Sequence, residues 1–305
     1  MAFGAVILFF ALATDRLIGD PHSSYHPVAL LGRFIGLWGK THYYPKRLER
    51  LIGMLGWTAT TLIFLLIPLL LTVFAPWYIY IPAAVLLLSF CFAWRSLEEH
   101  VGAVESALGK GETEGRAAVR MMVSRDVDKL SHEQIRSAAY ESAAENLVDS
   151  IIAPIFWFAV FELLFGAGLV GAAFFRAANT MDAMLGYTDD RIRIGWFAAR
   201  MDDILAWIPA RISGGVLLIL FVLHRRAAQA LRTFRADRKK RPGFNGGIPM
   251  SLIAGGCGVM FDKPGVYTIG VPEQTLETGG REVIRIIREA TVLFSGLVMV
   301  VLLAM

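Results

Sequence analysis

Residues 51 to 74 form an almost unbroken apolar run, and this run limits what the chain can fold into more than any other feature. At about 1.5 Å per residue, a helix over this run is long enough to cross a hydrocarbon core of about 30 Å. Hydrophobic residues make up 55% of the chain and charged residues 18%, and the mean hydropathy is +0.54. This composition is too apolar for an ordinary soluble domain, so the sequence predicts an integral membrane protein.

A second apolar run, from Trp77 to Trp94, follows the first after a short Ala-Pro turn. Tryptophan and tyrosine side chains stand near the ends of both runs, as is typical of membrane interfaces. The two runs predict a transmembrane hairpin over residues 51–94. Residues 2–13 are also apolar, and no Lys or Arg precedes them, which favours a retained first membrane helix over a signal peptide.

The later apolar segments are shorter. Residues 151–161 are followed by Glu162 and two glycines, and the runs at 212–223 and 291–305 are short as well. Segments of about 10–14 apolar residues are more often buried or re-entrant than spanning. We therefore expect half-helices that fold back toward a polar cavity, with one fold-back at Gly166. The fold class is an all-α integral membrane protein with about five transmembrane or partly re-entrant helices and a cytosolic helical layer.

Two polar regions indicate how the chain is oriented. Residues 95–150 are rich in Ala, Glu and Arg and predict a cytosolic helical layer with a glycine turn. Residues 224–241 carry eight Lys or Arg and a single Asp. Basic residues mark the cytoplasmic side, so we expect 95–150 and 225–288 on that side of a single membrane-embedded domain, 1–305, in the cell membrane. The basic run contains a single Phe, Phe234, and no nucleic-acid binding motif, which favours contact with membrane lipid and not with nucleic acid.

Three acidic residues stand four positions apart in "YESAAENLVDSIIAPIFWF", directly before an apolar run: Glu141, Glu145 and Asp149. On a helix they share one face, because they drift only about 80° around its axis. Stacked like charges are unfavourable unless a cation joins them, and such oxygen ligands suit Mg²⁺ better than zinc. A solvated helix face is the alternative. Ionisable groups at a membrane edge are costly and tend to be functional, which favours the metal site.

Two further motifs, "FRAANTMDAMLGY" and "ARMDDILAWIPAR", place arginine near acids or amides beside breaks in the apolar segments. Their polar members are Arg176, Asn179, Thr180, Asp182, Arg200, Asp202, Asp203 and Arg211. Arginine forks hold phosphate oxygens while carboxylates hold a bridging metal, an arrangement that phosphoryl chemistry requires. The alternative is that each arginine pairs with a nearby aspartate, and the sequence does not decide between the two for any single pair.

The remaining polar motifs lie near the two ends of the chain. In "DRLIGDPHSSYHPVALLGRFIG", His26 can act as a general base or a phosphate donor, although a loop histidine more often forms a structural hydrogen bond. The segment "RPGFNGGIPMSLIAGGCGVMFDKPGVY" contains Asn245 and Lys263 but is not a GxxxxGK[ST] loop. On its own it is a weak indication of phosphate binding.

Six ordered motifs, "DRLIGDPHSSYHPV", "VSRD", "ESAAENLVDSIIAP", "FRAANTMDAMLGY", "ARMDDILAWIPAR" and "FNGGIPMSLIAGGCGV", resemble those of the membrane-bound adenosylcobinamide-phosphate synthase family of cobalamin biosynthesis. They extend from Asp15 to about Gly270. Two positions depart from the family pattern. Gly243-Phe244 stands where the family usually has Ser-Pro, which is expected to alter a ligand loop. Ala206 stands where it usually has Asn, which is expected to remove one polar contact.

This resemblance implies a ligase that forms an amide at the expense of ATP. It would join a carboxylate of the corrinoid adenosylcobyric acid to the amine of 1-aminopropan-2-ol or its O-phosphate, most simply through an acyl phosphate. The active site would face the cytoplasm, and the resemblance allows a homo-oligomer or contact with other membrane enzymes of cobalamin assembly.

Under this activity we assign each predicted site residue a role. We expect Mg²⁺ at Glu141, Glu145, Asp149 and Asp182, nucleotide or phosphate contacts at Arg176, Asn179, Arg200, Arg211, Asn245 and Lys263, and catalysis at His26, Asp202 and Asp203.

Two other classes of protein stay open. A non-catalytic membrane sensor of the same superfamily would share the scaffold but lack several motif acids. A small-molecule transporter would also explain broken helices around polar residues. All the motif acids are present, the polar motifs cluster at the predicted cytosolic edge, and the sequence shows no pair of equivalent halves. These observations favour the enzyme.

Overall fold

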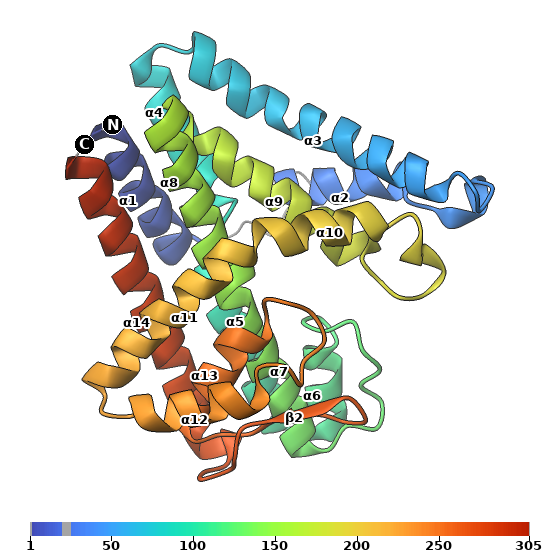
Figure 1. Ribbon diagram of the computed structural model, residues 1–305, viewed down its shortest axis with the longest axis vertical. Coiled ribbons are helices and arrows are strands. Elements are labelled where there is room, and N and C mark those ends of the chain that lie inside the picture. The colour runs from blue at the N-terminus through green and yellow to red at the C-terminus, as the bar shows by residue number, and fades with distance from the viewer. Residues whose placement is uncertain (1, 20–25, 305) are drawn as a thin grey trace. The chain divides into compact units, whose positions relative to one another are not determined.

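The computed structural model describes residues 2–19 and 26–304, which are mostly helical (Figure 1). They divide into two compact units. Unit 1 comprises residues 1–93, 153–206 and 296–305, and unit 2 comprises residues 94–152 and 207–295. The prediction of an all-α protein is confirmed, and the polar layer predicted at 95–150 lies within unit 2. The prediction of one membrane-embedded domain stays a prediction.

Several helical segments of the described chain are suited to a membrane. Four are long and apolar enough to cross one, and there are up to five if the two helices on either side of Ala206 count as a single span. The four are Glu49–Phe74, Trp77–Leu108, His132–Phe165 and Leu276–Ala304. This agrees with the number of spanning or partly re-entrant helices predicted from the sequence.

Unit 1 is organised around the helix α9. Its α-helices are α1 (Ala2–Leu17), α2 (Pro27–Trp38), α3 (Glu49–Phe74), α4 (Trp77–Ser89), α8 (Ala153–Phe165), α9 (Gly168–Leu185) and α10 (Trp196–Leu205), and its 3-10 helices are η1 (Thr41–Tyr43) and η3 (Asp190–Ile192). Helix α9 packs against α8, α3, α10 and α2. Small buried side chains such as Ala172 and Ala177 allow these neighbours to approach closely.

The predicted transmembrane hairpin forms in sequence, but its two helices diverge in space. Helix α3 ends at Phe74, Ala75 and Pro76 make the turn, and α4 begins at Trp77. Helix α4 packs mainly against α1, whereas α3 packs mainly against α9 (Figure 1). Much of the apolar surface of α3 is consequently exposed, as expected for a helix that faces lipid.

The fold-back predicted at Gly166 is present. Helix α8 ends at Phe165, Gly166 adopts a φ of +63°, and α9 returns along α8. Glycine adopts this left-handed conformation without the steric cost that a side chain would impose. The buried carboxylate of Glu162 completes the turn, because its Oε2 accepts a hydrogen bond of 3.0 Å from the backbone N–H of Gly168 at the start of α9.

Two of the segments expected to be short half-helices, 151–161 and 291–305, are parts of longer helices, so the prediction was wrong for them. The third, 212–223, belongs to a helix pair that is bent by 41° and forms a broken span or a re-entrant loop. Residues 151–161 continue α7 as far as Phe165, residues 212–223 belong to α11, and the segment at 291–305 is the end of α14. Only the apolar residues were counted in the prediction. A helix keeps its hydrogen bonds through charged turns, so it extends beyond its apolar part.

Unit 2 is organised around α7. Its elements are α5 (Trp94–Leu108), α6 (Glu112–Val119), α7 (His132–Leu147), the π-helix η2 (Val148–Ile152), α11 (Trp207–Leu223), α12 (Ala227–Asp237), α13 (Gly247–Cys257), the antiparallel strands β1 (Phe261–Lys263) and β2 (Tyr267–Ile269), and most of α14 (Leu276–Ala304). A capping box of Ser131 and Gln134 starts α7. Helix α7 packs against α5, α6, α13 and β1, and thus carries its side chains into the middle of the unit.

The π-helix η2 interrupts the regular spacing of the acidic residues. It follows α7 directly and contains Asp149. Pro154 comes just after it, and a proline ring lacks an N–H and crowds the carbonyl four residues earlier, here that of Ser150. A π-turn relieves this crowding without ending the helix. Asp149 therefore leaves the 3.6-residue periodicity that Glu141 and Glu145 keep.

Candidate functional site

Charged and polar side chains from distant segments meet on one side of α7 in unit 2. We refer to Arg125, Glu141, Glu145, Arg241 and Tyr267 as the α7 cluster. The two acids lie on α7, Arg125 lies in the loop before it, Arg241 follows α12, and Tyr267 lies on β2. Of the three acids predicted to share one helix face, Glu141 and Glu145 both interact with Tyr267, whereas Asp149 lies on the π-turn.

Glu141 is the most buried acid of the cluster, with 5% of its surface exposed. Its Oε1 accepts hydrogen bonds from Ser137 Oγ at 2.6 Å and from Arg125 Nη2 at 3.3 Å. Its Oε2 accepts one from the hydroxyl of Tyr267 at 3.0 Å. Ser137 also accepts a bond of 2.6 Å from the backbone N–H of Asp262, so the strand β1 fixes the same corner. Both oxygens of Glu141 are thus held in place.

Tyr267 remains a hydrogen-bond donor at neutral pH. Burial, the negative charge of Glu141 and the hydrogen bond to it raise the pKa of Tyr267 above its ordinary value of about 10. The ammonium group of Lys263 lies 5.8 Å from the centre of the same tyrosine ring. Lys263, predicted to contact phosphate, is therefore next to the α7 cluster.

Glu145 forms an ion pair with Arg241. The Glu145 side chain is 32% exposed and that of Arg241 is 23% exposed. Burial alone would lower the pKa of Arg241, but the charges of Glu145 and Asp149 outweigh it and raise that pKa. A Cβ atom at Gly246 would lie 2.6 Å from Nε of Arg241, and one at Gly243 would lie 2.8 Å from Nη1. The glycine-rich loop therefore makes room for this guanidinium.

The sequence departure at Gly243-Phe244 falls in this loop. Gly243 has a φ of +101°, a conformation that a serine side chain would strain. Phe244 is exposed, whereas the adjacent Asn245 is buried. The loop of this chain thus needs the glycine that it has. The second departure, Ala206, is buried and directly follows α10 in the sequence.

Two predicted phosphate contacts, Arg211 and Asn245, are brought together in unit 2. Nη1 of Arg211 donates to Oδ1 of Asn245 at 2.9 Å and to the backbone carbonyl of Trp207 at 2.8 Å. The guanidinium also lies over the indole of Trp207, 4.1 Å from the ring centre. Stacking and two hydrogen bonds hold Arg211 in one orientation.

The other predicted residues lie in unit 1, where the clearest pair is Asn179 and Asp202. Asn179 Nδ2 donates to Asp202 Oδ1 at 3.2 Å and so connects α9 with α10. Arg176 and Thr180 are one turn apart, as predicted, and the threonine hydroxyl donates to the carbonyl of Arg176 at 2.7 Å. Arg200 is exposed on α10 and forms no side-chain interaction with any residue that the structure describes. The metal and catalytic candidates Asp182 and Asp203 lie on α9 and α10, respectively.

His26 serves a structural purpose in unit 1. It is the N-cap of α2, and its Nδ1 accepts a hydrogen bond of 3.2 Å from the backbone N–H of Val28. Its ring also packs edge-on against Phe90, 4.8 Å between ring centres. Of the same N-terminal motif, Asp15 is buried near the end of α1, while Asp20 and His22 lie outside the described residues.

The predicted site residues are therefore divided between the units. Glu141, Glu145, Asp149, Arg211, Asn245 and Lys263 are in unit 2, and His26, Arg176, Asn179, Asp182, Arg200, Asp202 and Asp203 are in unit 1. Within residues 2–19 and 26–304, no three His, Cys, Asp or Glu side chains are grouped closely enough to hold a metal ion by themselves. The metal assignment stays a prediction.

Three residues of the α7 cluster were missed by sequence reasoning. Arg125 lies in the motif "VSRD" but had no role assigned. Arg241 and Tyr267 are the first and last residues of the glycine-rich segment, where only Asn245 and Lys263 were assigned a role. Arg241 is 96 residues from Glu145, and Tyr267 is 126 residues from Glu141, so no local spacing could have connected them.

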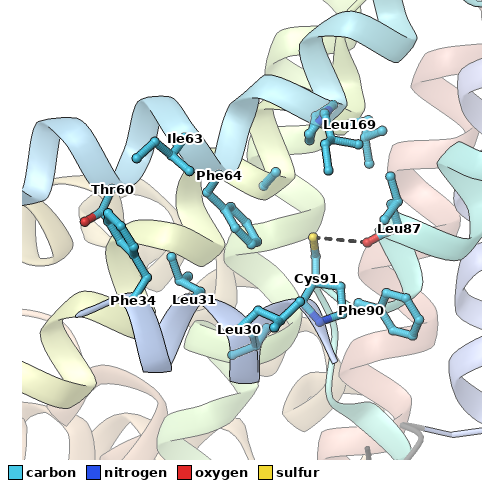
Figure 2. Close-up of a pocket in the computed structure, with 15 residues that line it drawn as sticks. Leu30, Leu31, Phe34, Thr60, Ile63, Phe64, Leu87, Phe90, Cys91 and Leu169 are labelled. Atoms are coloured by element: carbon cyan, nitrogen blue, oxygen red, sulfur yellow. Dashed lines mark hydrogen bonds between the residues drawn. The ribbon is translucent and has the colours of Figure 1, made fainter. Parts of the chain in front are cut away.

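Unit 1 also contains a cavity of about 300 Å³ between α2, α3, α4 and α9 (Figure 2). Apolar side chains such as Leu31, Phe64 and Leu169 line it. Its few polar atoms are occupied, because the Thr60 hydroxyl accepts from Trp38 at 3.0 Å and the Cys91 thiol donates to the Leu87 carbonyl at 3.5 Å. None of the predicted site residues lines this cavity, which lacks the charged groups that phosphate chemistry needs.

Comparison with known proteins gives consistent matches over most of the chain. Residues 8–294 match the family described as CobD/Cbib protein. The chain is 36% identical to a "Probable cobalamin biosynthesis protein CobD" of Thermococcus kodakarensis over 98% of this chain and 95% of that one. It is also 36% identical to the protein of that name in Methanothermobacter thermautotrophicus, over 87% and 86%. A "Cobalamin biosynthesis protein CobD" of Dehalococcoides mccartyi is 31% identical over 87% and 86%. No solved structure matches the chain.

Proposed function

The chain belongs to the CobD/Cbib protein family of cobalamin biosynthesis, and from this membership we propose that it forms an amide bond at the expense of ATP. The reaction joins a carboxylate of adenosylcobyric acid to the amine of 1-aminopropan-2-ol or its O-phosphate. A carboxylate does not react with an amine until its oxygen becomes a good leaving group, and an acyl phosphate supplies one. The site must therefore bind phosphate and carboxylate oxygens side by side.

The observation that carries this proposal is the α7 cluster. In it Arg125 and Tyr267, a tyrosine that stays protonated, donate hydrogen bonds to Glu141, and Arg241 forms an ion pair with Glu145. Fixed donors of this kind stabilise charge on transferring phosphoryl and acyl groups without reorganising during the reaction. Arg211, held over Trp207, adds a further oriented guanidinium to unit 2.

The acids of unit 2 offer a partial fit to Mg²⁺. Both oxygens of Glu141 already accept hydrogen bonds, whereas Glu145 has one ion-pair partner, Arg241, among the described residues, and Asp149 lies close enough to raise the pKa of that arginine. Magnesium is commonly held by only one or two carboxylates together with substrate phosphates. We therefore propose that Glu145 and Asp149 would hold the ion. When bound, it would neutralise phosphate charge.

The unit 1 residues have a separate part in the proposal. Asp202 is oriented by Asn179, and it or Asp203 would accept the proton that the amine must lose before it attacks. Arg176 keeps its proposed role in contacting phosphate. Nδ1 of His26 is used to cap α2, so any proton transfer by this residue would use Nε2.

The experiment is an assay of the purified full-length protein in detergent. ATP hydrolysis should depend on adenosylcobyric acid and on the amine, and mass spectrometry should detect the amide product. Parallel reactions with 1-aminopropan-2-ol and with its O-phosphate identify the amine. Absence of product with both amines, under conditions where the protein remains folded, would refute the proposal. A non-catalytic sensor or a transporter would give that result.

We further propose that residues 95–150 and 225–288 lie on the cytoplasmic side of the cell membrane. Arg120 and Arg238 are suitable labelling positions, because both lie outside the segments that could span a membrane. The two native cysteines, Cys91 and Cys257, are buried, which keeps the background low. Cysteines placed at 120 and 238 should resist an impermeant maleimide added to intact cells and react after lysis. Labelling of either in intact cells would overturn the orientation.

A further inference from the structure

Arg125 is the one member of the α7 cluster whose hydrogen-bonding capacity the described chain leaves mostly unused. Its Nη2 donates to Glu141 at 3.3 Å. Its Nε and Nη1 are buried and have no hydrogen-bond partner among residues 2–19 and 26–304. A buried donor without an acceptor costs about 1–3 kcal/mol, and buried polar groups are seldom left so. Two such donors on one guanidinium indicate that an acceptor from outside the chain belongs there.

The guanidinium is held in this orientation by its surroundings. The side chain is only 15% exposed, and it contacts a carboxylate that Ser137 and Tyr267 hold from two other directions. The loop itself is also braced, because the backbone N–H of Asp128 donates to Oδ1 of Asp126 at 2.9 Å and Asp128 forms an ion pair with Arg120. Arg125 is thus positioned before any ligand arrives.

Other arginines of unit 2 differ from Arg125. Arg116 donates through Nε and Nη2 to the carbonyl of Leu130 and also pairs with Glu112. Arg136 forms ion pairs with three glutamates, at 3.1, 3.3 and 3.4 Å. These arginines serve the fold, whereas two nitrogens of Arg125 do not.

We propose that Arg125 binds an oxyanion of a substrate, a carboxylate or a phosphate, through one of its two unpartnered nitrogens, Nε or Nη1. Glu141 is the positioning residue: it orients the guanidinium and is already saturated by Ser137, Arg125 and Tyr267. The inference rests on the proposed function for the identity of its candidate ligands. Arginine suits such a ligand because its planar N–H groups are directed, and because it is always charged.

The test measures binding without turnover. The full-length protein in detergent is titrated separately with inorganic pyrophosphate, a non-hydrolysable ATP analogue, adenosylcobyric acid and aminopropanol phosphate. Arg125→Gln should weaken binding of at least one of these ligands by tenfold or more. The affinity of Arg125→Lys should lie between those of the unchanged protein and Arg125→Gln, since lysine keeps the charge but loses the planar guanidinium. The matched control is Lys129→Gln, which removes an exposed positive charge from the same loop and should change binding less than twofold.

The affected ligand identifies the source of the oxyanion. Weaker binding of pyrophosphate and the ATP analogue indicates a nucleotide phosphate, weaker binding of the corrinoid indicates its carboxylate, and weaker binding of aminopropanol phosphate alone indicates the amine substrate. Equal affinities of Arg125→Gln and the unchanged protein for all four ligands would overturn the proposal, as would no binding of any of them by the unchanged protein. A protein that binds a ligand through Arg125 but makes no amide would refute the proposed reaction alone.

Arg125→Gln can lower stability because it leaves the charge of Glu141 uncompensated. The double variant Arg125→Gln with Glu141→Gln removes both charges and should restore the thermal midpoint. If the double variant still binds the ligand as the unchanged protein does, the proposal fails. Lost binding in a protein with a normal midpoint supports it.

Discussion

Replacing Glu145 by Gln separates a metal site from a purely structural ion pair, because it removes one charge and changes the shape very little. Exposed ion pairs contribute about 0–1 kcal/mol, and breaking a buried pair costs about 3–5 kcal/mol. With side chains 32% and 23% exposed, Glu145 and Arg241 lie between these cases. We expect Glu145→Gln to lower the free energy of unfolding by about 1–2 kcal/mol through loss of this pair.

The two accounts differ in activity. If Glu145 only pairs with Arg241, activity should follow the fraction of folded protein. If Glu145 also holds Mg²⁺, activity should fall by about two orders of magnitude, which corresponds to about 3 kcal/mol of transition-state stabilisation. The assay is a Mg²⁺ titration of ATP-dependent amide formation, together with the thermal midpoint of each protein.

Arg241→Gln distinguishes the two accounts more clearly, because they predict different changes in the Mg²⁺ requirement. Under the metal account it removes a competing positive charge, so less Mg²⁺ should be needed for half-maximal activity. Under the ion-pair account, Arg241→Gln should lower stability about as much as Glu145→Gln does. The double variant with both substitutions should lower it little more than either single one. The matched control is Glu112→Gln, which breaks an ion pair with Arg116 of similar exposure, 43% and 26%, outside the cluster. Full activity of Glu145→Gln at an unchanged Mg²⁺ requirement would refute the metal assignment.

Three further predictions concern single side chains. Arg225, just after α11, has a φ of +59°, and the similar end of α13 has Gly258 at +64°. Arg225→Gly should therefore stabilise the protein by about 1 kcal/mol, and Gly258→Ala should destabilise it. A lower thermal midpoint for Arg225→Gly would contradict this. Arg176→Lys keeps the charge but not the planar fork, so the KM for ATP or for the amine phosphate should rise in a protein that still folds, and unchanged kinetics would leave Arg176 a structural role. Because the pKa of Tyr267 is raised, the unfolded chain loses this proton before the folded one, and stability should fall as the pH rises above about 10. In urea unfolding at pH 9 and 11, Tyr267→Phe should lose less stability than the unchanged protein, and equal losses in both proteins would count against this.

Sequence patterns predicted the parts of the fold that depend on local chemistry. The turn at Ala75–Pro76 and the fold-back at Gly166 both lie at residues that often end a helix, a proline and a glycine with positive φ. Helix length was underestimated where charged residues continue an apolar segment, as in α14, because the apolar run measures what meets lipid and not where hydrogen bonding stops.

The site could be predicted only as far as helical periodicity reaches. The common face of Glu141 and Glu145 follows from their spacing, since four residues are close to one turn. The shift of Asp149 onto a π-turn depends on Pro154, whose effect on the preceding turn was not considered. The partners Arg125 and Arg241 come from a loop and from the end of another helix, and tertiary packing alone brings them to α7.

The carboxylate of Glu162 that caps α9 also limits which residues evolution can place at positions 4 and 168. A Cβ atom at Gly4 would lie 2.7 Å from Oε1 of Glu162, and one at Gly168 would lie 3.0 Å from Oε2 and 2.7 Å from the ring of Phe158. Neither glycine can gain a side chain while the glutamate keeps its length and place. In an alignment of relatives, a larger residue at position 4 should therefore occur together with a shorter residue at position 162. Covariation between these two columns, which are far apart in sequence, would record the packing of α1 against α8.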